Sequence, residues 1–302
     1  MVIGLMKYLL GVDGGGTKTA FMLTDLDGNS VASITLSRSN PNDIGIDNTI
    51  ALLLEGFSSL CEQTGITNDC ISAIFAGIAG VTANDFISRI KAAVSVAYPD
   101  SLIGVNHDGV NILYAAFPES DGAGVICGTG TSCFVKKGDV LHRIGGYGLF
   151  DLYGGGYEIG RAAISHALRT VDGRDSSGFL SEAVKKKAGC DLIKGLGTLI
   201  ASGKSNIASY ATLVYDAYLQ SDSYAEGILD AHIGYLAELI NTAQRHFEGT
   251  YNVSLAGGIG KDPITMRILK PKLTPAAVVT PLECEPIHGA IARTKVLLHK
   301  GI

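Results

Sequence analysis

The sequence is short of charge, of basic runs and of long apolar segments. Only 18% of its 302 residues are charged and the net charge is −5, while its longest basic run is three lysines at 185–187. A nucleic acid, which is a polyanion, is therefore not expected as a partner. The apolar N-terminal stretch is broken at Lys7 and Asp13, far short of the roughly 18 residues that a membrane span needs. We expect no membrane partner either, and a hydrophobic content of 46% excludes a disordered chain.

The six cysteines lack the spacing of a disulfide framework or of a zinc site. No CxxC pair occurs, and no histidine stands at zinc-finger spacing from any of them. Such cysteines are typical of reduced, mostly buried thiols in a cytoplasmic protein. A signal peptide is not expected, because the N-terminal apolar stretch leads directly into glycines without a cleavage site. Met6 is an alternative start, which would make residues 1–5 an extension.

Glycine is abundant, with 39 residues, and it punctuates alternating strand and helix patterns. A strand, a glycine turn and a hairpin occur near residue 8 and again near residue 124, which predicts an α/β fold of two similar domains. We assign 1–115 to an N-terminal domain, 116–285 to a C-terminal domain, and 286–302 to a helix that packs back on the first. The periodicities predict strands at 8–12, 21–24, 31–36, 71–78, 102–106, 124–127, 133–136, 140–144, 253–256 and 276–280, and helices at 47–65, 86–97 and 286–298.

Three glycine-rich turns follow predicted strands, and each has the composition of a phosphate-binding loop. They are GVDGGGTKT at 11–19, GTGTS at 128–132 and GGIG at 257–260. Glycines permit positive φ and leave backbone N–H groups uncovered, so such a turn can form a cradle for an anion. One turn alone is weak evidence, since a tight hairpin also uses glycine. Three of them at matching places in two α/β halves predict a nucleotide clasped between the domains.

An ordered set of motifs resembles one known family. DGGGTKT, Asn40, HDG at 107–109, GTGTS, GGYG at 145–148 and AGGI at 256–259 follow the order of the N-acetylglucosamine kinase and BadF/BadG-type ATPase family. This family belongs to the superfamily of sugar kinases, actin and heat-shock chaperones. The resemblance covers almost the whole chain. It implies two ribonuclease-H-like domains of the actin-like ATPase fold, ATP and an amino sugar in the cleft between them, Mg²⁺ as a cofactor, and a homodimer.

The resemblance also implies roles for individual residues. Asp13 fits Mg²⁺ better than phosphate, because like charges repel. The sugar would contact Asn40, Gly80, Asp108, Gly145 and Gly146. ATP would be bound by the first loop, the second loop and the third turn, which contribute Gly14, Gly15, Gly16, Thr17 and Lys18, then Gly128, Thr129, Gly130 and Thr131, and finally Gly257 and Gly258.

Two polar residues have both a catalytic and a purely structural interpretation. A sugar hydroxyl is a poor nucleophile at neutral pH, so transfer benefits from a carboxylate that accepts its proton. Asp108 follows a predicted strand and matches the base of similar kinases, but with Gly109 behind it an Asx turn or a helix cap is the alternative. The Asn40 amide can both donate to and accept from a sugar diol, whereas the Asn-Pro dipeptide is also common in turns.

The match to the family fails at one place. Similar kinases follow the GGWG motif with an acidic stretch that holds sugar hydroxyls, but here 145–160 is one residue short, and Leu152 and Tyr153 stand where the acidic pair would be. We hypothesise that Asp151 has taken over this contact. The competing hypothesis is that Leu149, Phe150 and Leu152 accommodate a bulkier or less polar acceptor.

The resemblance favours an ATP-dependent kinase acting on the 6-hydroxyl of N-acetylglucosamine. N-acetylmuramic acid and glucosamine are alternative acceptors. Two other classes remain open from the sequence. An ATP-driven activator of a radical dehydratase would need cysteines such as Cys127 and Cys133 to bind an iron–sulfur cluster, although a strand–turn–strand path would bury them. A catalytically silent sugar sensor is the third class, and the altered acidic stretch motivates it.

Overall fold

The computed structural model describes residues 6–151 and 154–300. The alternative-start extension at 1–5 and the family-departure residues Leu152 and Tyr153 lie outside the described residues. The chain divides into two compact units. Unit 1 is Met1–Ser120 with Leu282–Ile302, and unit 2 is Asp121–Pro281. The division thus falls at 120/121, close to the expected 115/116, and the final helix belongs to unit 1.

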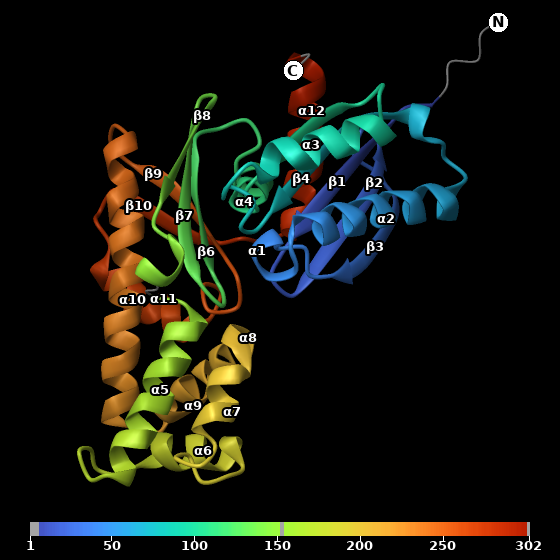
Figure 1. The fold of residues 1–302 in the computed structure, drawn as a ribbon. Helices are drawn as coiled ribbons and strands as arrows, with labels where there is room; N and C mark the ends of the chain where they lie inside the picture. Colours follow the sequence, from blue (N-terminus) through green and yellow to red (C-terminus); the bar gives the residue numbers. More distant parts are fainter. Residues whose placement is uncertain (1–5, 152–153, 301–302) are drawn as a thin grey trace, which may run out of the picture. The chain divides into compact units, whose positions relative to one another are not determined.

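Unit 1 contains a five-stranded sheet in the order β3-β2-β1-β4-β5 (Figure 1). The first three strands are antiparallel neighbours because tight turns join them, and Gly28 supplies the positive φ of the second turn. The last two strands run parallel to β1, since helices make the crossovers. The strands are β1 Tyr8–Gly14, β2 Lys18–Asp25, β3 Ser30–Ser37, β4 Ile71–Ile78 and β5 Leu102–Asn106.

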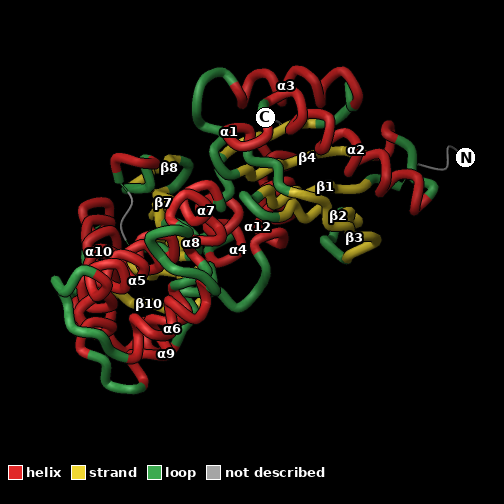
Figure 2. Tube along the Cα trace, turned by 60° about the horizontal axis from the view of Figure 1, so that its bottom comes forward, coloured by secondary structure: helices red, strands yellow, loops and turns green. Residues whose placement is uncertain are grey.

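Helices cover both faces of the unit 1 sheet (Figure 2). Alternate residues of β1 point to opposite faces, so Leu10 and Val12 face the α2 and α3 side, while Leu9 contributes to a second cluster with Ile291 of α12. Helix α12 also packs against α4. These helices are α1 Pro41–Ile44, α2 Ile46–Thr64, α3 Phe86–Ala97, α4 Gly109–Ala116 and α12 Pro286–Lys300.

Unit 2 repeats the strand order of unit 1 in a second sheet, β10-β9-β6-β7-β8. Its first three strands, β6, β7 and β8, form antiparallel pairs, and β9 and β10 are parallel to β6 and to each other. The strands are β6 Gly122–Cys127, β7 Thr131–Lys137, β8 Val140–Ile144, β9 Tyr251–Ala256 and β10 Ala277–Pro281.

A long helical segment joins β8 to β9. Helix α10 packs along β6, β7 and β8, and α5 packs against α6, α8, α9 and α10 (Figure 1). Among the residues described, no helix is both long enough and apolar enough to cross a membrane. The helices of unit 2 are α5 Gly156–Val171, α6 Phe179–Ala188, α7 Leu196–Ala201, α8 Gly203–Ala208, α9 Ala211–Leu219, α10 Ser223–Ala243 and, after β9, α11 Pro263–Leu269.

Candidate functional site

The carboxyl ends of three parallel strands meet at one edge of the unit 1 sheet. In the register of β1, β4 and β5, Gly14 pairs with Ile78, and Gly77 pairs with Asn106. The loops that follow these strands therefore start side by side. They carry the expected phosphate, sugar and base residues of unit 1, at the edge where α/β sheets present ligand-binding groups.

Backbone hydrogen bonds tie the first glycine loop to its neighbours. Gly15 N donates to Lys18 O at 3.0 Å, which closes the hairpin between β1 and β2. Ala79 N donates to Gly14 O at 2.7 Å, and Ser39 N donates to Gly15 O at 3.2 Å. These two bonds hold Asn40, which follows Ser39, and Gly80, which follows Ala79, beside the loop. Both are expected sugar contacts.

The first glycine loop does not use the positive φ that glycine permits. Gly14, Gly15 and Gly16 all lie outside the left-handed region. Gly14 is required for a different reason, because a β-carbon there would collide with Ser39 Oγ. Gly16 and the following Thr17 and Lys18 are exposed, so they are accessible to a ligand.

Asn40 and Gly80 lie in direct contact. Gly80 has a φ of +75°, and a β-carbon on it would collide with the Asn40 and Asn42 amides. Asn40 Oδ1 accepts from the backbone N of Asn42 at 3.0 Å and from Asn42 Nδ2 at 3.1 Å. Asn42 Nδ2 also donates to Gly80 O at 3.0 Å. Because its oxygen is occupied, Asn40 offers its Nδ2 as a donor, rather than both groups of its amide as the sequence suggested.

Asp108 does not cap helix α4. It occupies the N-cap position, but its side chain accepts no capping hydrogen bond and its backbone is helical, with φ −57° and ψ −27°. Its buried Oδ1 lies 2.5 Å from His107 Nδ1, close enough for an ion pair with a protonated imidazole. The Asp108 side chain is 20% exposed. The structure thus removes the capping alternative and leaves a partly exposed carboxylate beside His107.

Asp13 is the last residue but one of strand β1 and lies in a largely buried environment. Burial raises its pKa to about 7, the Asn111 side chain opposes this, and the negative charge of Asp108 adds to it. Asn111 Nδ2 donates to Asp13 Oδ1 at 2.7 Å. Asp13 and Asp108 are therefore close enough to influence each other electrostatically.

The second and third glycine turns meet at one edge of the unit 2 sheet. Strands β6 and β9 are parallel, so the loops after Cys127 and Ala256 lie together. Gly260 N donates to Cys127 O at 3.1 Å, and two amides from the start of α5 donate to the second loop. These are Gly156 N to Gly128 O at 2.7 Å and Tyr157 N to Thr129 O at 2.9 Å.

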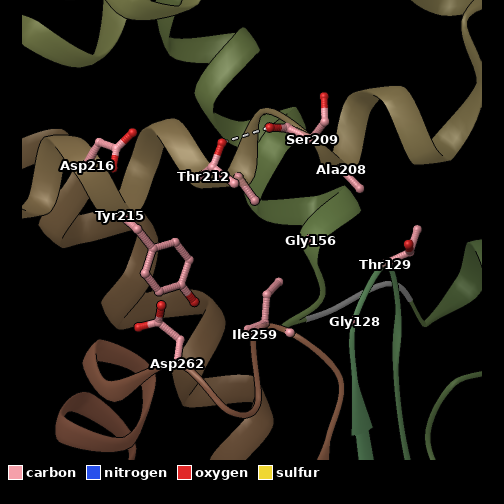
Figure 3. Close-up of a pocket in the computed structure, with 12 residues that line it drawn as sticks. Gly128, Thr129, Gly156, Ala208, Ser209, Thr212, Tyr215, Asp216, Ile259 and Asp262 are labelled. Carbon is pink, nitrogen blue, oxygen red and sulfur yellow. Dashed lines mark hydrogen bonds between the residues drawn. The ribbon is translucent and has the colours of Figure 1, made fainter.

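A cavity of about 580 Å³ opens beside these two turns (Figure 3). Gly128, Thr129 and Gly258 line it together with residues of α9 and with Asp262, which precedes α11. The Tyr215 ring forms part of the wall, and its hydroxyl is hydrogen-bonded to Thr265 Oγ1 at 2.7 Å. The other lining residues are Gly156, Ala208, Ser209, Ala211, Thr212, Asp216 and Ile259. This size and its mixed lining suit a nucleoside.

The glycines of these turns differ in what the fold requires of them. A β-carbon on Gly257, whose φ is +92°, would collide with Cys127 O. By contrast, a β-carbon on Gly128, Gly130 or Gly258 would meet no atom within 4 Å, and none of the three has positive φ. The fold itself therefore does not require glycine at these three positions. A ligand that approaches the backbone there would require it, because a side chain would occupy the same space.

Two of the remaining expected sugar residues, Gly146 and Asp151, line a second, smaller cavity in unit 2, and Gly145 precedes them without lining it. The cavity has a volume of about 280 Å³, and Thr131, Gly146 and Asp151 line it with Tyr235, Glu238 and Leu239 of α10. The Arg143 side chain donates to Gly145 O and Gly146 O, which holds the turn. Asp151 Oδ2 accepts from Tyr147 N at 3.3 Å. A second carboxylate, Glu238, thus faces the cavity of Asp151.

The cysteines of unit 2 are poorly suited to bind a cluster. Cys127 and Cys133 are fully buried, and burial raises the pKa of each thiol to about 12. Thiolates, not thiols, ligate iron. All six cysteines of the chain are free thiols, as the sequence predicted.

Three groups of site residues were not predicted from the sequence. Six residues between 208 and 216 line the larger cavity, and the spacing of three and four among those of α9 could have revealed a shared face. Asp262 caps α11 by accepting from Ile264 N, a signal visible as Asp before Pro. Nothing in the sequence pointed to Glu238 or Asn111, because their neighbours come from distant segments.

Comparison with known proteins identifies the family. Residues 10–291 match the BadF/BadG/BcrA/BcrD ATPase family. The chain belongs to this family.

Two curated relatives of this family member are sugar kinases. An N-acetylmuramic acid/N-acetylglucosamine kinase of Clostridium acetobutylicum is 32% identical over 233 residues, covering 74% of this chain and 75% of its own. An N-acetyl-D-glucosamine kinase of Dictyostelium discoideum is 26% identical, covering 94% and 96%. Among solved structures, a candidate N-acetylglucosamine kinase from Chromobacterium violaceum superposes with a TM-score of 0.79 at 23% identity, covering 95% and 98%. This likeness confirms the actin-like ATPase fold.

Proposed function

We propose that this chain is an ATP-dependent kinase that transfers the γ-phosphate of ATP to the 6-hydroxyl of N-acetylglucosamine or a close relative. The observation that carries the proposal is Asp108, a partly exposed carboxylate at the edge of the unit 1 sheet that does not cap its helix. A sugar hydroxyl placed against the exposed part of this carboxylate would lose its proton to it as the phosphoryl group arrives.

The glycine loops support the ATP part of the proposal. Gly128, Gly130 and Gly258 have open space where a β-carbon would stand, so the phosphates can approach the backbone amides there. In unit 1 the exposed Thr17 and Lys18 add a hydroxyl and a positive charge. The larger unit 2 cavity would hold the adenosine.

Asp13 fits the cation that such transfer uses. The described residues include no group of three or more His, Cys, Asp or Glu side chains that could enclose a metal ion. Mg²⁺ in kinases is instead held by one or two carboxylates, by water and by the substrate phosphates. Asp13 stands beside the first phosphate loop with Oδ1 occupied by Asn111, which leaves Oδ2 for the ion. When bound, Mg²⁺ supplies charge neutralisation of the phosphates.

Polar side chains would recognise the acceptor. Asn40 would donate from Nδ2, and Asp151 would accept from sugar hydroxyls. The names of the relatives include N-acetylmuramic acid, N-acetylglucosamine and glucosamine as substrates, so all three belong in the first substrate panel. We also propose a cytoplasmic homodimer, which light scattering of the purified protein would test.

A coupled assay with purified protein, ATP and this panel tests the function. Asp108→Asn should keep ATP and sugar binding but lower kcat by about 10²–10⁴. The matched control is Asp100→Asn, since Asp100 is an exposed aspartate of the same unit, and it should behave like the wild type. Near-normal kcat in Asp108→Asn would contradict the base assignment. ATP turnover that no sugar stimulates would instead favour a silent sensor.

A further inference from the structure

Asn111 is a fully buried amide that touches neither ATP nor sugar in the proposed reaction. It lies in the first turn of α4, where its exposed fraction is 0%. Its backbone N donates to Asp108 O at 3.0 Å. Buried polar atoms are normally hydrogen-bonded, but Asn111 Oδ1 has no partner among the described residues. The side chain therefore acts through its NH₂ group.

That NH₂ group contacts the ends of two neighbouring strands. Its nitrogen lies 2.7 Å from Asp13 Oδ1, 3.2 Å from Val12 O and 3.4 Å from Gly77 O. Asp13 and Gly77 are paired in the parallel register of β1 and β4. The shortest of these contacts is to the carboxylate, and a hydrogen bond to a charged acceptor is the strongest kind.

Two glycines clamp Asn111 in this position. A β-carbon on Gly77 would collide with the Asn111 side-chain amide, and one on Gly289 of α12 would collide with the Asn111 backbone oxygen. The side chain is thus confined by β4 and the backbone by α12. Such close approach fixes the direction in which the amide donates.

We propose that Asn111 is a positioning residue that holds Oδ1 of Asp13 and so presents Oδ2 to a divalent cation. This inference rests on the proposed function, in which Asp13 binds Mg²⁺. No described residue donates a hydrogen bond to Asp13 Oδ2. Since Asn111 and Asp108 share one helical turn, the same contact fixes the base relative to the cation site.

Direct metal binding tests the proposal without relying on turnover. Mn²⁺ is the probe, and its binding to the full-length protein with ATP is followed by electron paramagnetic resonance. Asn111→Leu removes the donor at similar volume and should raise the Mn²⁺ Kd by about 10–100-fold. The affinity for ATP without metal and the KM for sugar should stay within about twofold, which is less than 0.5 kcal/mol.

Three further variants separate positioning from a general loss of structure. Asn111→Ala removes the donor without adding volume, and it repeats the measurement if the leucine does not fold. Thr294→Val alters another fully buried residue of unit 1, whose hydroxyl donates to Ile291 O, and should leave the Mn²⁺ Kd unchanged. Asp13→Asn combined with Asn111→Leu should bind Mn²⁺ no more weakly than Asp13→Asn alone, because the amide acts through Asp13.

Unchanged Mn²⁺ affinity in the folded Asn111 variants would overturn the proposal. A loss that adds in full to the effect of Asp13→Asn would overturn it as well. The proposed function fails separately, if the wild type phosphorylates no amino sugar of the panel. In that case the Mn²⁺ measurement still decides the role of Asn111.

Discussion

The two units share one sheet topology but present different chemistry at the same edge. In both sheets an antiparallel three-stranded meander is followed by two parallel strands, and a glycine loop joins the first two strands. The edge of unit 1 carries two carboxylates, Asp13 and Asp108, next to a crowded loop. The edge of unit 2 carries loops held by α5 amides beside a cavity of about 580 Å³. The same sheet topology thus positions two carboxylates in unit 1 and borders a ligand-sized cavity in unit 2.

Asp13 of unit 1 and His232 of unit 2 should make the free energy of unfolding depend on pH in opposite directions. Burial raises the pKa of Asp13 in unit 1 to about 7, and in unit 2 burial, aided by Arg161, lowers the pKa of His232 to about 4. Between about pH 4 and 7 the folded state holds more protons on Asp13 than the unfolded state, so this contribution to stability falls as pH rises. Between about pH 6.5 and 4 the unfolded state holds more protons on His232, so its contribution falls as pH falls.

Urea denaturation of the ligand-free protein at about pH 5 and about pH 8 separates these contributions. Asp13→Asn should stabilise the protein more at the higher pH, by at most about 4 kcal/mol for the three-unit shift. His232→Gln should remove a destabilisation that grows toward the lower pH, of at most about 3 kcal/mol. If both variants responded to pH with the same sign, this contrast between the units would be wrong.

Glycine substitutions sharpen the contrast between the loops. Gly130→Val should leave stability nearly unchanged, since nothing lies within 4 Å of its β-carbon position. It should lower kcat/KM for ATP by roughly 100-fold, because the valine side chain would displace the phosphates. Gly14→Ala should instead destabilise unit 1, because its β-carbon meets Ser39. The control is Gly227→Val on α10, which is equally open. Calorimetry showing normal ATP affinity in Gly130→Val would make the second loop merely structural.

The smaller cavity of unit 2 offers two carboxylates for the sugar. Asp151→Ala should raise the sugar KM by about ten- to hundredfold, the value of a charge-assisted hydrogen bond, with ATP binding little changed. Glu238→Ala provides the comparison, since both residues line the cavity. A silent Asp151→Ala together with a preference for N-acetylmuramic acid would support the bulkier-acceptor hypothesis. A loss in Glu238→Ala alone would move the contact to α10.

Asn42 should have the smallest effect, because it acts through Asn40 in unit 1. Asn42→Ala removes one of the two donors that orient the Asn40 amide, a change of about 1 kcal/mol or roughly fivefold in sugar KM. The ATP KM should not change. Asn48→Ala is the matched control, since this exposed amide donates to Ile44 O instead. Equal effects of the two variants would exclude a specific role for Asn42.

Local patterns in the sequence were sufficient to predict most of the fold. Apolar alternation and the Asp27-Gly28 turn predict the first meander, and helical spacing predicts α2 and α3, because these signals depend only on residues a few positions apart. The order of the glycine turns, with Asn40 and the segment at 107–109, also predicted which residues share the edge of unit 1. These residues meet there because parallel strands end on the same side.

Only the tertiary structure decided how those residues are held. Asn111 and Asp13 are 98 positions apart, and their contact depends on how α4 docks against β1 and β4. Whether the fold requires glycine at Gly14 or Gly130 depends on which atoms lie near the position that a β-carbon would take. The same holds for Glu238, which reaches the cavity of Asp151 from α10. Sequence patterns report the preferences of neighbouring residues, whereas these contacts follow from the register and docking of distant elements.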